Sequence, residues 1–264
     1  MLLNIVHQTT YRYDQRLPYA LQRVRLIPRT DAMQTVDRWE LSYEGAREEV
    51  RFVDHFGNQC RLLSTEPGAS QIVITAKGMV TTRDQTGVAG QHAGFAPLWL
   101  FERETPLTMP SDALGALSKP LGGPETLELL HDLMDAIAKR VAYVPGSTTS
   151  ETTADAALAA GQGVCQDHTH IFISVVRMQG LPARYVSGYL MMDDTTQQVA
   201  THAWAEAHVP GLGWVGFDVS NSMCPDERYV RVAFGRDYRD AMPVAGIRQG
   251  QAHEELEVRV TVEQ

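Results

Sequence analysis

The sequence has few cysteines, no long apolar run and no basic leader, and each shortage excludes a class of protein. Three cysteines, Cys60, Cys165 and Cys224, lie far apart among 264 residues. An odd number at such spacing does not make a disulfide framework, which favours a reducing compartment. No apolar run is long enough to span a bilayer, and the first residues, MLLNIVHQTTYRY, lack the features of a signal peptide. We therefore expect a cytoplasmic protein with no membrane partner.

Basic residues are also in short supply. Lys and Arg number 23 against 32 Asp and Glu, which gives a formal net charge of −9. Nucleic acids and anionic membrane surfaces are bound through a basic footprint, so we expect no nucleic-acid partner. The hydrophobic fraction of 44% and the charged fraction of 21% are those of a globular protein. The length suffices for one large domain or two ordinary ones, and for a sizeable core.

The first hundred residues have the pattern of an antiparallel β-sandwich. Short segments rich in β-branched and aromatic residues, several of them alternating between apolar and polar, predict strands at 2–13, 21–27, 38–43, 49–53, 59–63 and 71–76. Residues 54–58 resemble a hairpin turn in which Gly57 takes positive φ. We assign residues 1–105 to an N-terminal β-sandwich domain.

Helical periodicity appears after Pro124, where leucines recur on one face of a segment that continues to about residue 141. A second short helix is predicted at 151–160, ending at Gly161. The last segment, 254–263, alternates cleanly and is expected to complete a sheet. Residues 106–264 are therefore assigned to a second domain, and the fold class is α+β.

The stretch GQGVCQDHTHIFISVVRMQG places Cys165 in the first turn of a largely buried helix. Unpaired backbone N–H groups and the helix dipole favour negative charge there, and the thiolate is the reactive form of cysteine. The same amides can hold an oxyanion. A small, buried, inert cysteine fits this stretch equally well. The stretch alone leaves the choice open.

Two later segments, 201–209 and 214–220, are joined by a short Gly-containing turn and predict a hairpin. Alternation puts His202, Trp204 and Glu206 on one face of its first strand, together with His208. If Val209 pairs with Gly213, His202 lies diagonal to Asp218, within reach of a hydrogen bond. Cys165, His202 and Asp218 then form a set that can act as nucleophile, base and orienting group.

Four blocks of this sequence resemble the transglutaminase-like cysteine enzymes of bacteria, which include cysteine proteases. They are GVCQDHTH, GLPARYVSGYL, HAWAE and GWVGFD, in the order and at the separations typical of that family. The segment LNIVHQTTYRYDQRLPYALQRVRLIPR resembles the β-domain that commonly precedes the catalytic domain in bacteria. The resemblance thus extends over nearly the whole chain. It implies a papain-like catalytic core with Cys165 as nucleophile, His202 as base and Asp218 as third member.

Several residues close to the Cys-His-Asp set have less definite expected roles. The expected role of Asp167 and His170 is buried, hydrogen-bonded support for the helix, with direct participation as the alternative. Trp204 is expected in the core or in the wall of the cleft. Glu206 is expected to contact substrate or to lie in solvent. His168 departs from the family pattern, which has an aromatic or apolar residue at this position.

Two other classes of function remain open at this stage. The first is a metal site, whose candidate ligands are Cys165, His168, His170, His202, His208 and Asp218. The spacing C-x-x-H-x-H is not usual for zinc, and His170 would point away from its neighbours on a helix. We therefore expect no metal and no cofactor. The second is a non-catalytic binding module, against which the intact Cys-His-Asp set argues.

The preferred function is that of a cysteine peptidase or amidase that acts on a peptide or protein amide through an acyl-enzyme. The alternative within the same chemistry is a protein-glutamine amine acyltransferase, which crosslinks proteins. Water access and an amine subsite decide between the two, and the sequence reveals neither.

Overall fold

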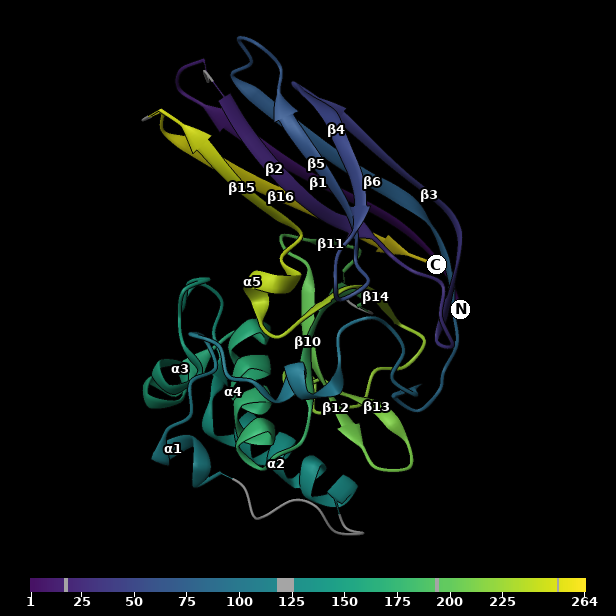
Figure 1. Ribbon diagram of the computed structural model, residues 1–264, viewed down its shortest axis with the longest axis vertical. Coiled ribbons are helices and arrows are strands. Elements are labelled where there is room, and N and C mark those ends of the chain that lie inside the picture. Colours follow the sequence, from purple (N-terminus) through teal and green to yellow (C-terminus); the bar gives the residue numbers. More distant parts are fainter. Residues whose placement is uncertain (17–18, 118–125, 193–194, 251) are drawn as a thin grey trace.

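The computed structural model describes residues 1–16, 19–117, 126–192, 195–250 and 252–264. Most strands pair in antiparallel sheets, as expected. A β-sandwich forms the upper part of the molecule in Figure 1, and a smaller sheet with its helices lies beneath it. The two termini lie close together at one end of the sandwich, where the first and last strands are neighbours.

The sandwich consists of two sheets whose apolar faces meet. One sheet has the order β11 (Gln197–Gln198), β16 (Glu254–Glu263), β1 (Leu2–Tyr13), β6 (Gln71–Thr82), β3 (Gln34–Glu44). The other has the order β15 (Val244–Gln249), β2 (Tyr19–Ile27), β5 (Gln59–Thr65), β4 (Ala46–Val53). Val24 and Leu63 of one sheet pack with Ile74 of the other in a single buried cluster. The prediction of an antiparallel sandwich is confirmed.

The predicted hairpin turn joins β4 to β5. The Asp54 backbone N–H donates to the Asn58 carbonyl at 3.0 Å, and Gly57 takes φ of 83°. The Asn58 side chain extends beyond the turn. It donates to the Phe234 carbonyl at 2.7 Å and accepts from the Phe234 N–H at 2.8 Å. This turn therefore attaches the sandwich to strand β14 of the smaller sheet.

The last two strands return to the sandwich. β16 pairs with β1, with Ile5 opposite Val262, and β15 pairs with β2, with Val24 opposite Val244. The expected C-terminal strand is thus confirmed. The division into domains at 105/106 stays a prediction, and strand pairing does not follow it. Strands β15 and β16 complete the N-terminal sheets, while β7 (Val88–Gly90) pairs with β13.

The smaller sheet has the order β14 (Tyr229–Gly235), β10 (Ala183–Leu190), β12 (His202–Val209), β13 (Gly213–Phe217), β7. The helices of the molecule lie beside this sheet. They are α1 (Asp112–Gly115), α2 (Thr126–Arg140), α3 (Ala154–Ala160), α4 (Cys165–Met178), α5 (Tyr238–Ala241) and the 3₁₀ helix η1 (Leu98–Glu102). A short parallel pair, β8 (Ala142–Tyr143) and β9 (Gln162–Gly163), precedes α4. Pro124, where the helical period begins, lies outside the described residues.

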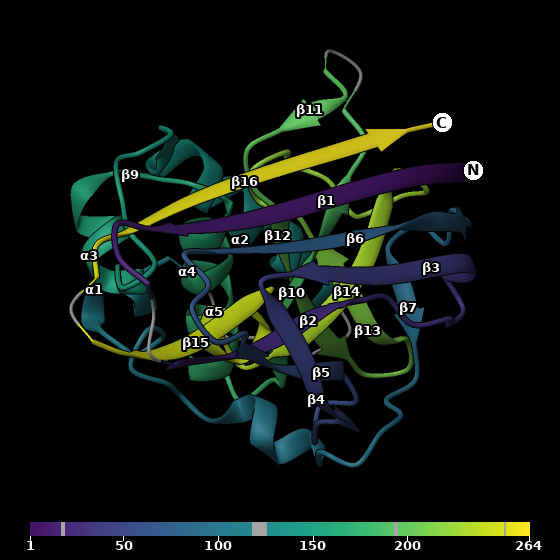
Figure 2. The ribbon, with the colours of Figure 1, turned by 90° about the horizontal axis from the view of Figure 1, so that it is seen from above.

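Helix α4 crosses β12 on a face of small side chains. Ala203, Ala205 and Ala207 alternate toward the helix and share one buried cluster with Ile171 and Phe172 of α4. Their size lets the helix approach the sheet closely. Figure 2 shows α4 and β12 beneath the sandwich strands. Within the described ranges, no helix combines the length and apolarity needed to cross a membrane.

Candidate active site

Helix α4 begins at Cys165, and a buried acid stabilises this beginning. The Asp167 carboxylate accepts from the Val164 N–H at 2.8 Å and from the Thr148 hydroxyl at 2.6 Å. Asp167 is fully buried against Gly163, where a β-carbon would lie 2.7 Å from the Asp167 β-carbon. Glycine is therefore required at 163 by close packing. These contacts hold the turn that presents Cys165.

The hairpin forms in the register expected from its short turn. Val209 pairs with Gly213, and Ala205 pairs with Phe217. His202 Nε2 then lies 2.6 Å from Asp218 Oδ2, and both side chains are buried. The diagonal His–Asp contact predicted from the alternation of the two strands is present.

Asp218 accepts several further hydrogen bonds. The Tyr229 hydroxyl and the Asn221 amide donate to Oδ2 at 2.8 Å and 2.7 Å. The backbone N–H groups of Ser220 and Asn221 donate to Oδ1 at 3.1 Å and 3.3 Å. Burial alone would raise the pKa of Asp218, but the charge of His202 and these donors outweigh it and lower the pKa. Asp218 is thus a fixed, ionised partner for the imidazole.

His202 is held between Asp218 and Cys165. Burial disfavours its charged form, but the Asp218 charge and hydrogen bonds to Asp218 and Cys165 raise the pKa of His202 to about 10. Because Nε2 is engaged by Asp218, Nδ1 is the nitrogen left for the Cys165 thiol. The Trp204 ring stacks on the imidazole at 6.1 Å between centroids and is buried. Trp204 thus lies in the core beside the site, as expected.

Three tyrosines lie within electrostatic range of the Cys165 thiol. Burial raises the pKa of Tyr143, Tyr185 and Tyr238, and negative charge on Cys165 raises each of them further. Tyr185 is buried, whereas Tyr143 is half exposed. Aromatic hydroxyl groups therefore lie near Cys165, together with His202, Asp218 and the first-turn acid Asp167.

The two histidines that follow Cys165 have structural partners. His168 lies 2.9 Å from both the Val141 carbonyl and the Ser220 hydroxyl, and so ties α4 to the loop after Asp218. His170 Nε2 accepts from the Tyr238 N–H at 3.1 Å. Burial lowers the pKa of His170 to about 3, so its ring is neutral. Among the described residues, no three His, Cys, Asp or Glu side chains gather as metal ligands would.

Glu206 is in neither of its expected places. It is buried, and its two oxygens accept from Arg184 Nε at 2.7 Å and Arg231 Nε at 2.9 Å. Arg231 also pairs with Asp31 of the sandwich at 2.5 Å. The expectation of substrate contact or solvent exposure is wrong, because sequence alternation shows the face of a strand but not which partner covers it. Glu206 is the centre of an ion network that joins the two parts of the molecule.

Sequence reasoning did not identify Asn221 and Tyr229 as site residues. Asn221 follows Asp218 by three positions, in a segment with the Asx-turn pattern, which was a usable signal. Tyr229 begins β14, eleven positions beyond Asp218, and reaches the carboxylate only through strand packing. Nothing in its local sequence distinguishes it from a core tyrosine.

Comparison with known proteins identifies matches to two family models and to full-length relatives. Residues 116–219 match the transglutaminase-like superfamily, and residues 3–81 match the bacterial transglutaminase-like N-terminal region. Uncharacterized protein ML0607 of Mycobacterium leprae is 26% identical over 274 residues, which cover 98% of each chain. Uncharacterized protein Mb2599c of Mycobacterium bovis is 29% identical over 272 residues, covering 92% of this chain and 86% of the relative.

A solved structure described as "a Putative Cysteine Protease from Cytophaga hutchinsonii" has the same fold, with a TM-score of 0.75 at 20% identity. The match covers 100% of this chain and 98% of that one. Both parts of the molecule, in the same arrangement, therefore occur in a known structure. The chain is a member of the transglutaminase-like superfamily that carries the bacterial transglutaminase-like N-terminal region.

Proposed function

We propose that the protein is a cysteine peptidase or amidase that cleaves amide bonds through an acyl-enzyme on Cys165. One observation carries the proposal. The Nε2 atom of a buried imidazole, His202, lies 2.6 Å from Oδ2 of the ionised Asp218, and the Cys165 thiol at the start of α4 is close enough to help raise the pKa of His202. This arrangement supplies a nucleophile, a base and an orienting group together. We also propose a reducing compartment such as the cytoplasm, because all three cysteines are free thiols.

Acylation uses these three residues in turn. The proton of the Cys165 thiol resides on His202, whose pKa is raised to about 10, and the Cys165 sulfur attacks the carbonyl carbon of the substrate amide as the thiolate. The oxyanion that forms is stabilised by first-turn N–H groups of α4, which have no intrahelical acceptor. His202 then gives its proton to the amide nitrogen, the C–N bond breaks and the amine leaves. Asp218 supports the imidazolium throughout, because its ionised form is stabilised.

Deacylation reverses the proton transfers. Water gives a proton to His202 and attacks the thioester, the C–S bond breaks, and the sulfur recovers the proton. A primary amine that takes the place of water gives a new amide instead. This second outcome is the crosslinking reaction of a protein-glutamine acyltransferase. We favour hydrolysis as the main outcome.

A library of glutamine-containing peptides, incubated with and without a labelled primary amine, tests the proposal. We expect new carboxyl groups, detected as hydrolysis products by mass spectrometry, with little incorporated label. Products must be absent with the Cys165→Ala variant. If most of the product carries the labelled amine, the protein is an acyltransferase instead. If the wild-type protein releases no product in either condition, it is not an amide-cleaving enzyme, and a binding module becomes the better description.

A further inference from the structure

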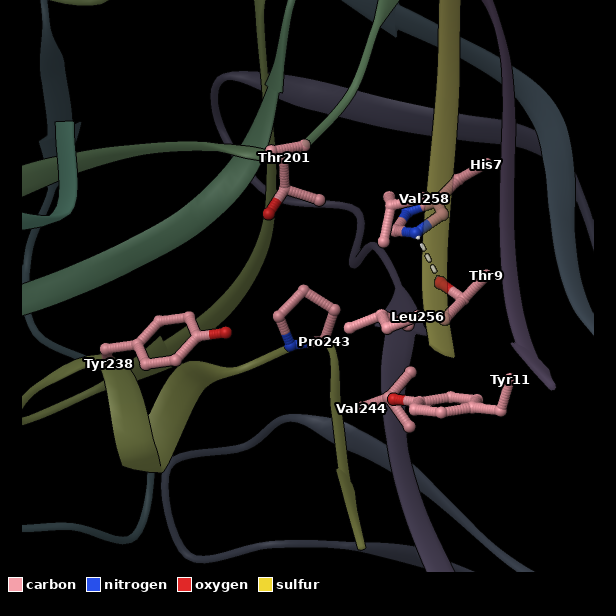
Figure 3. A pocket seen from close by; sticks show the side chains of 10 residues that line it. His7, Thr9, Tyr11, Thr201, Tyr238, Pro243, Val244, Leu256 and Val258 are labelled. Carbon is pink, nitrogen blue, oxygen red and sulfur yellow. Dashed lines mark hydrogen bonds between the residues drawn. The ribbon is translucent and has the colours of Figure 1, made fainter. Parts of the chain in front are cut away.

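A cavity lies where the sandwich meets the smaller sheet, beside the candidate active site. Its volume is about 120 Å³, and its lining comes from β1, β16, the segment before β12, and the region of α5. Figure 3 shows His7 and Thr9 on one side of it, with the Tyr238 hydroxyl pointing toward it from the other. The cavity is thus formed jointly by the N-terminal and catalytic parts of the chain.

The cavity adjoins the reacting groups. Thr201, which lines it, directly precedes His202. Tyr238, which also lines it, is close enough to Cys165 that thiolate charge adds to the effect of burial in raising the pKa of this tyrosine. None of the three proposed catalytic residues is itself part of the lining. The cavity therefore adjoins the site through Thr201 and Tyr238 without including the three proposed catalytic residues.

The lining combines apolar side chains with hydroxyl groups and contains, within the part of the chain that the structure describes, no acidic or basic side chain apart from His7. Val244, Leu256 and Val258 form its walls, and none of the described lining residues is Asp, Glu, Lys or Arg. His7 is its one imidazole, and burial lowers the pKa of His7 to about 4. Both nitrogens of that ring already have partners, the Tyr189 hydroxyl at 3.0 Å and the Thr9 hydroxyl at 2.9 Å. A charged group would lose its hydration here without gaining a counter-ion.

A longer groove continues from the cavity. An adjoining space of about 400 Å³ shares Tyr11, Tyr238, Val244 and Leu256 with it and extends along β15. β15 is the edge strand of its sheet, so its outer backbone groups are not paired within that sheet. An extended peptide can pair with such an edge, which places its alternate side chains in neighbouring pockets. The occupant that fits is therefore a peptide segment.

We propose that this cavity is the specificity pocket for a neutral, mainly apolar side chain, aromatic in preference, of a peptide substrate whose amide reaches Cys165. The inference rests on the proposed function and adds its substrate class. The hydroxyls of Thr9, Thr201 and Tyr238 give the polar end of a tyrosine side chain possible partners. The volume of about 120 Å³ is close to that of a cavity that holds a single aromatic ring.

The test compares peptides that differ at one residue, with phenylalanine or glutamate placed in turn at each position within three residues of the scissile amide. At one position, wild-type kcat/KM should favour phenylalanine by at least ~10-fold, because glutamate would be desolvated without a partner. The Leu256→Lys variant supplies a counter-charge at a lining residue that is 56% exposed and so tolerates substitution. We expect it to reduce the preference ~10-fold or reverse it.

Val6→Lys is the matched control. Val6 is also an exposed apolar residue of the same sheet, but it does not line the cavity. The Val6→Lys variant should leave the phenylalanine preference unchanged. Both Val6→Lys and Leu256→Lys should keep the wild-type rate of Cys165 alkylation. The pocket proposal fails if wild type shows no preference at any position, or if Leu256→Lys and Val6→Lys behave alike.

Binding separates this proposal from the proposed enzymatic function. The same peptides are titrated into the Cys165→Ala variant by calorimetry. A phenylalanine preference in binding, with no turnover by wild type, would overturn the enzyme proposal and keep the pocket. Turnover by wild type without any preference in binding or kcat/KM would overturn the pocket and keep the enzyme.

Discussion

Replacing Cys165 with serine should lower kcat/KM for amide cleavage by about 10⁴-fold or more, in the range found when enzymes lose their nucleophile. A serine hydroxyl is a far weaker acid than a thiol, so His202 and Asp218 cannot generate its anion as readily. The change replaces one sulfur by oxygen at a partly exposed position, and the fold should tolerate it. Steady-state kinetics on a peptide cleaved by the wild-type protein measures the effect.

Cys224→Ser is the matched control, because Cys224 is also a partly exposed free thiol. Burial raises the pKa of Cys224, so it is mainly protonated at neutral pH. Its replacement should change kcat/KM by less than about twofold, since surface changes away from a site have small effects. Retention of more than a tenth of wild-type activity by Cys165→Ser would contradict the assignment of the nucleophile.

Replacing Glu206 with glutamine should destabilise the fold by about 3–5 kcal/mol, the range for removing one partner of a buried ion pair. The change keeps the shape of the side chain but leaves Arg184 and Arg231 buried without their shared carboxylate. The guanidinium of Arg184 is already enclosed by the rings of Trp214 and Phe234, at 4.1 Å and 4.6 Å from their centroids. Guanidinium chloride unfolding measures the loss as a shift of the midpoint.

Asp31→Asn is the control for Glu206→Gln. Asp31 pairs with the same Arg231, but its side chain is 24% exposed, so its removal should destabilise the fold by no more than about 1 kcal/mol. If Glu206→Gln also falls below about 1 kcal/mol, the network is not the structural centre described above.

The pH dependence of stability gives a second measure of the same network. Burial opposes ionisation of Glu206, but Arg184 and Arg231 outweigh it and lower the pKa of Glu206. Its stabilising contribution is therefore complete above the pKa of the unfolded chain, and it is lost as pH falls through the lower folded-state pKa. The wild-type protein should lose stability on acidification more steeply than Glu206→Gln.

Local patterns were sufficient to predict the strands and the central pair of the site. The short turn after Val209 fixed the hairpin register, and register alone determined that His202 reaches Asp218. Apolar periodicity and the glycines placed Cys165 at the start of a buried helix. These features depend on residues close in sequence, or on two strands joined by a tight turn.

Long-range pairings could not be predicted in this way. The alternation of 254–263 indicates a half-buried strand, but nothing local identifies β1, some 250 residues earlier, as its partner. For the same reason, local patterns did not predict the contact of Tyr229 with Asp218. They also did not predict the ion network in which Arg231 links Glu206 of its own sheet to Asp31, between β2 and β3 of the sandwich. The cavity beside Cys165 depends on those pairings too, because four separate segments line it.

The rate of alkylation of each cysteine by iodoacetamide, read by mass spectrometry as a function of pH, tests the central claim most directly. His202 has a pKa of about 10 and so carries positive charge at neutral pH, where it can stabilise a thiolate on Cys165. At Cys60, burial and the charge of Asp54 outweigh the nearby Arg25 and Arg23 and raise the pKa of the thiol to about 11.

At pH 7 we expect Cys165 to react at least ~10-fold faster than Cys60 and Cys224, since the thiolate is the reacting form. The His202→Gln variant should lose this advantage while the other two cysteines keep their rates. A Cys165 that reacts no faster than Cys60 and Cys224, or one whose rate is indifferent to His202, would contradict the account of Cys165 as an activated nucleophile.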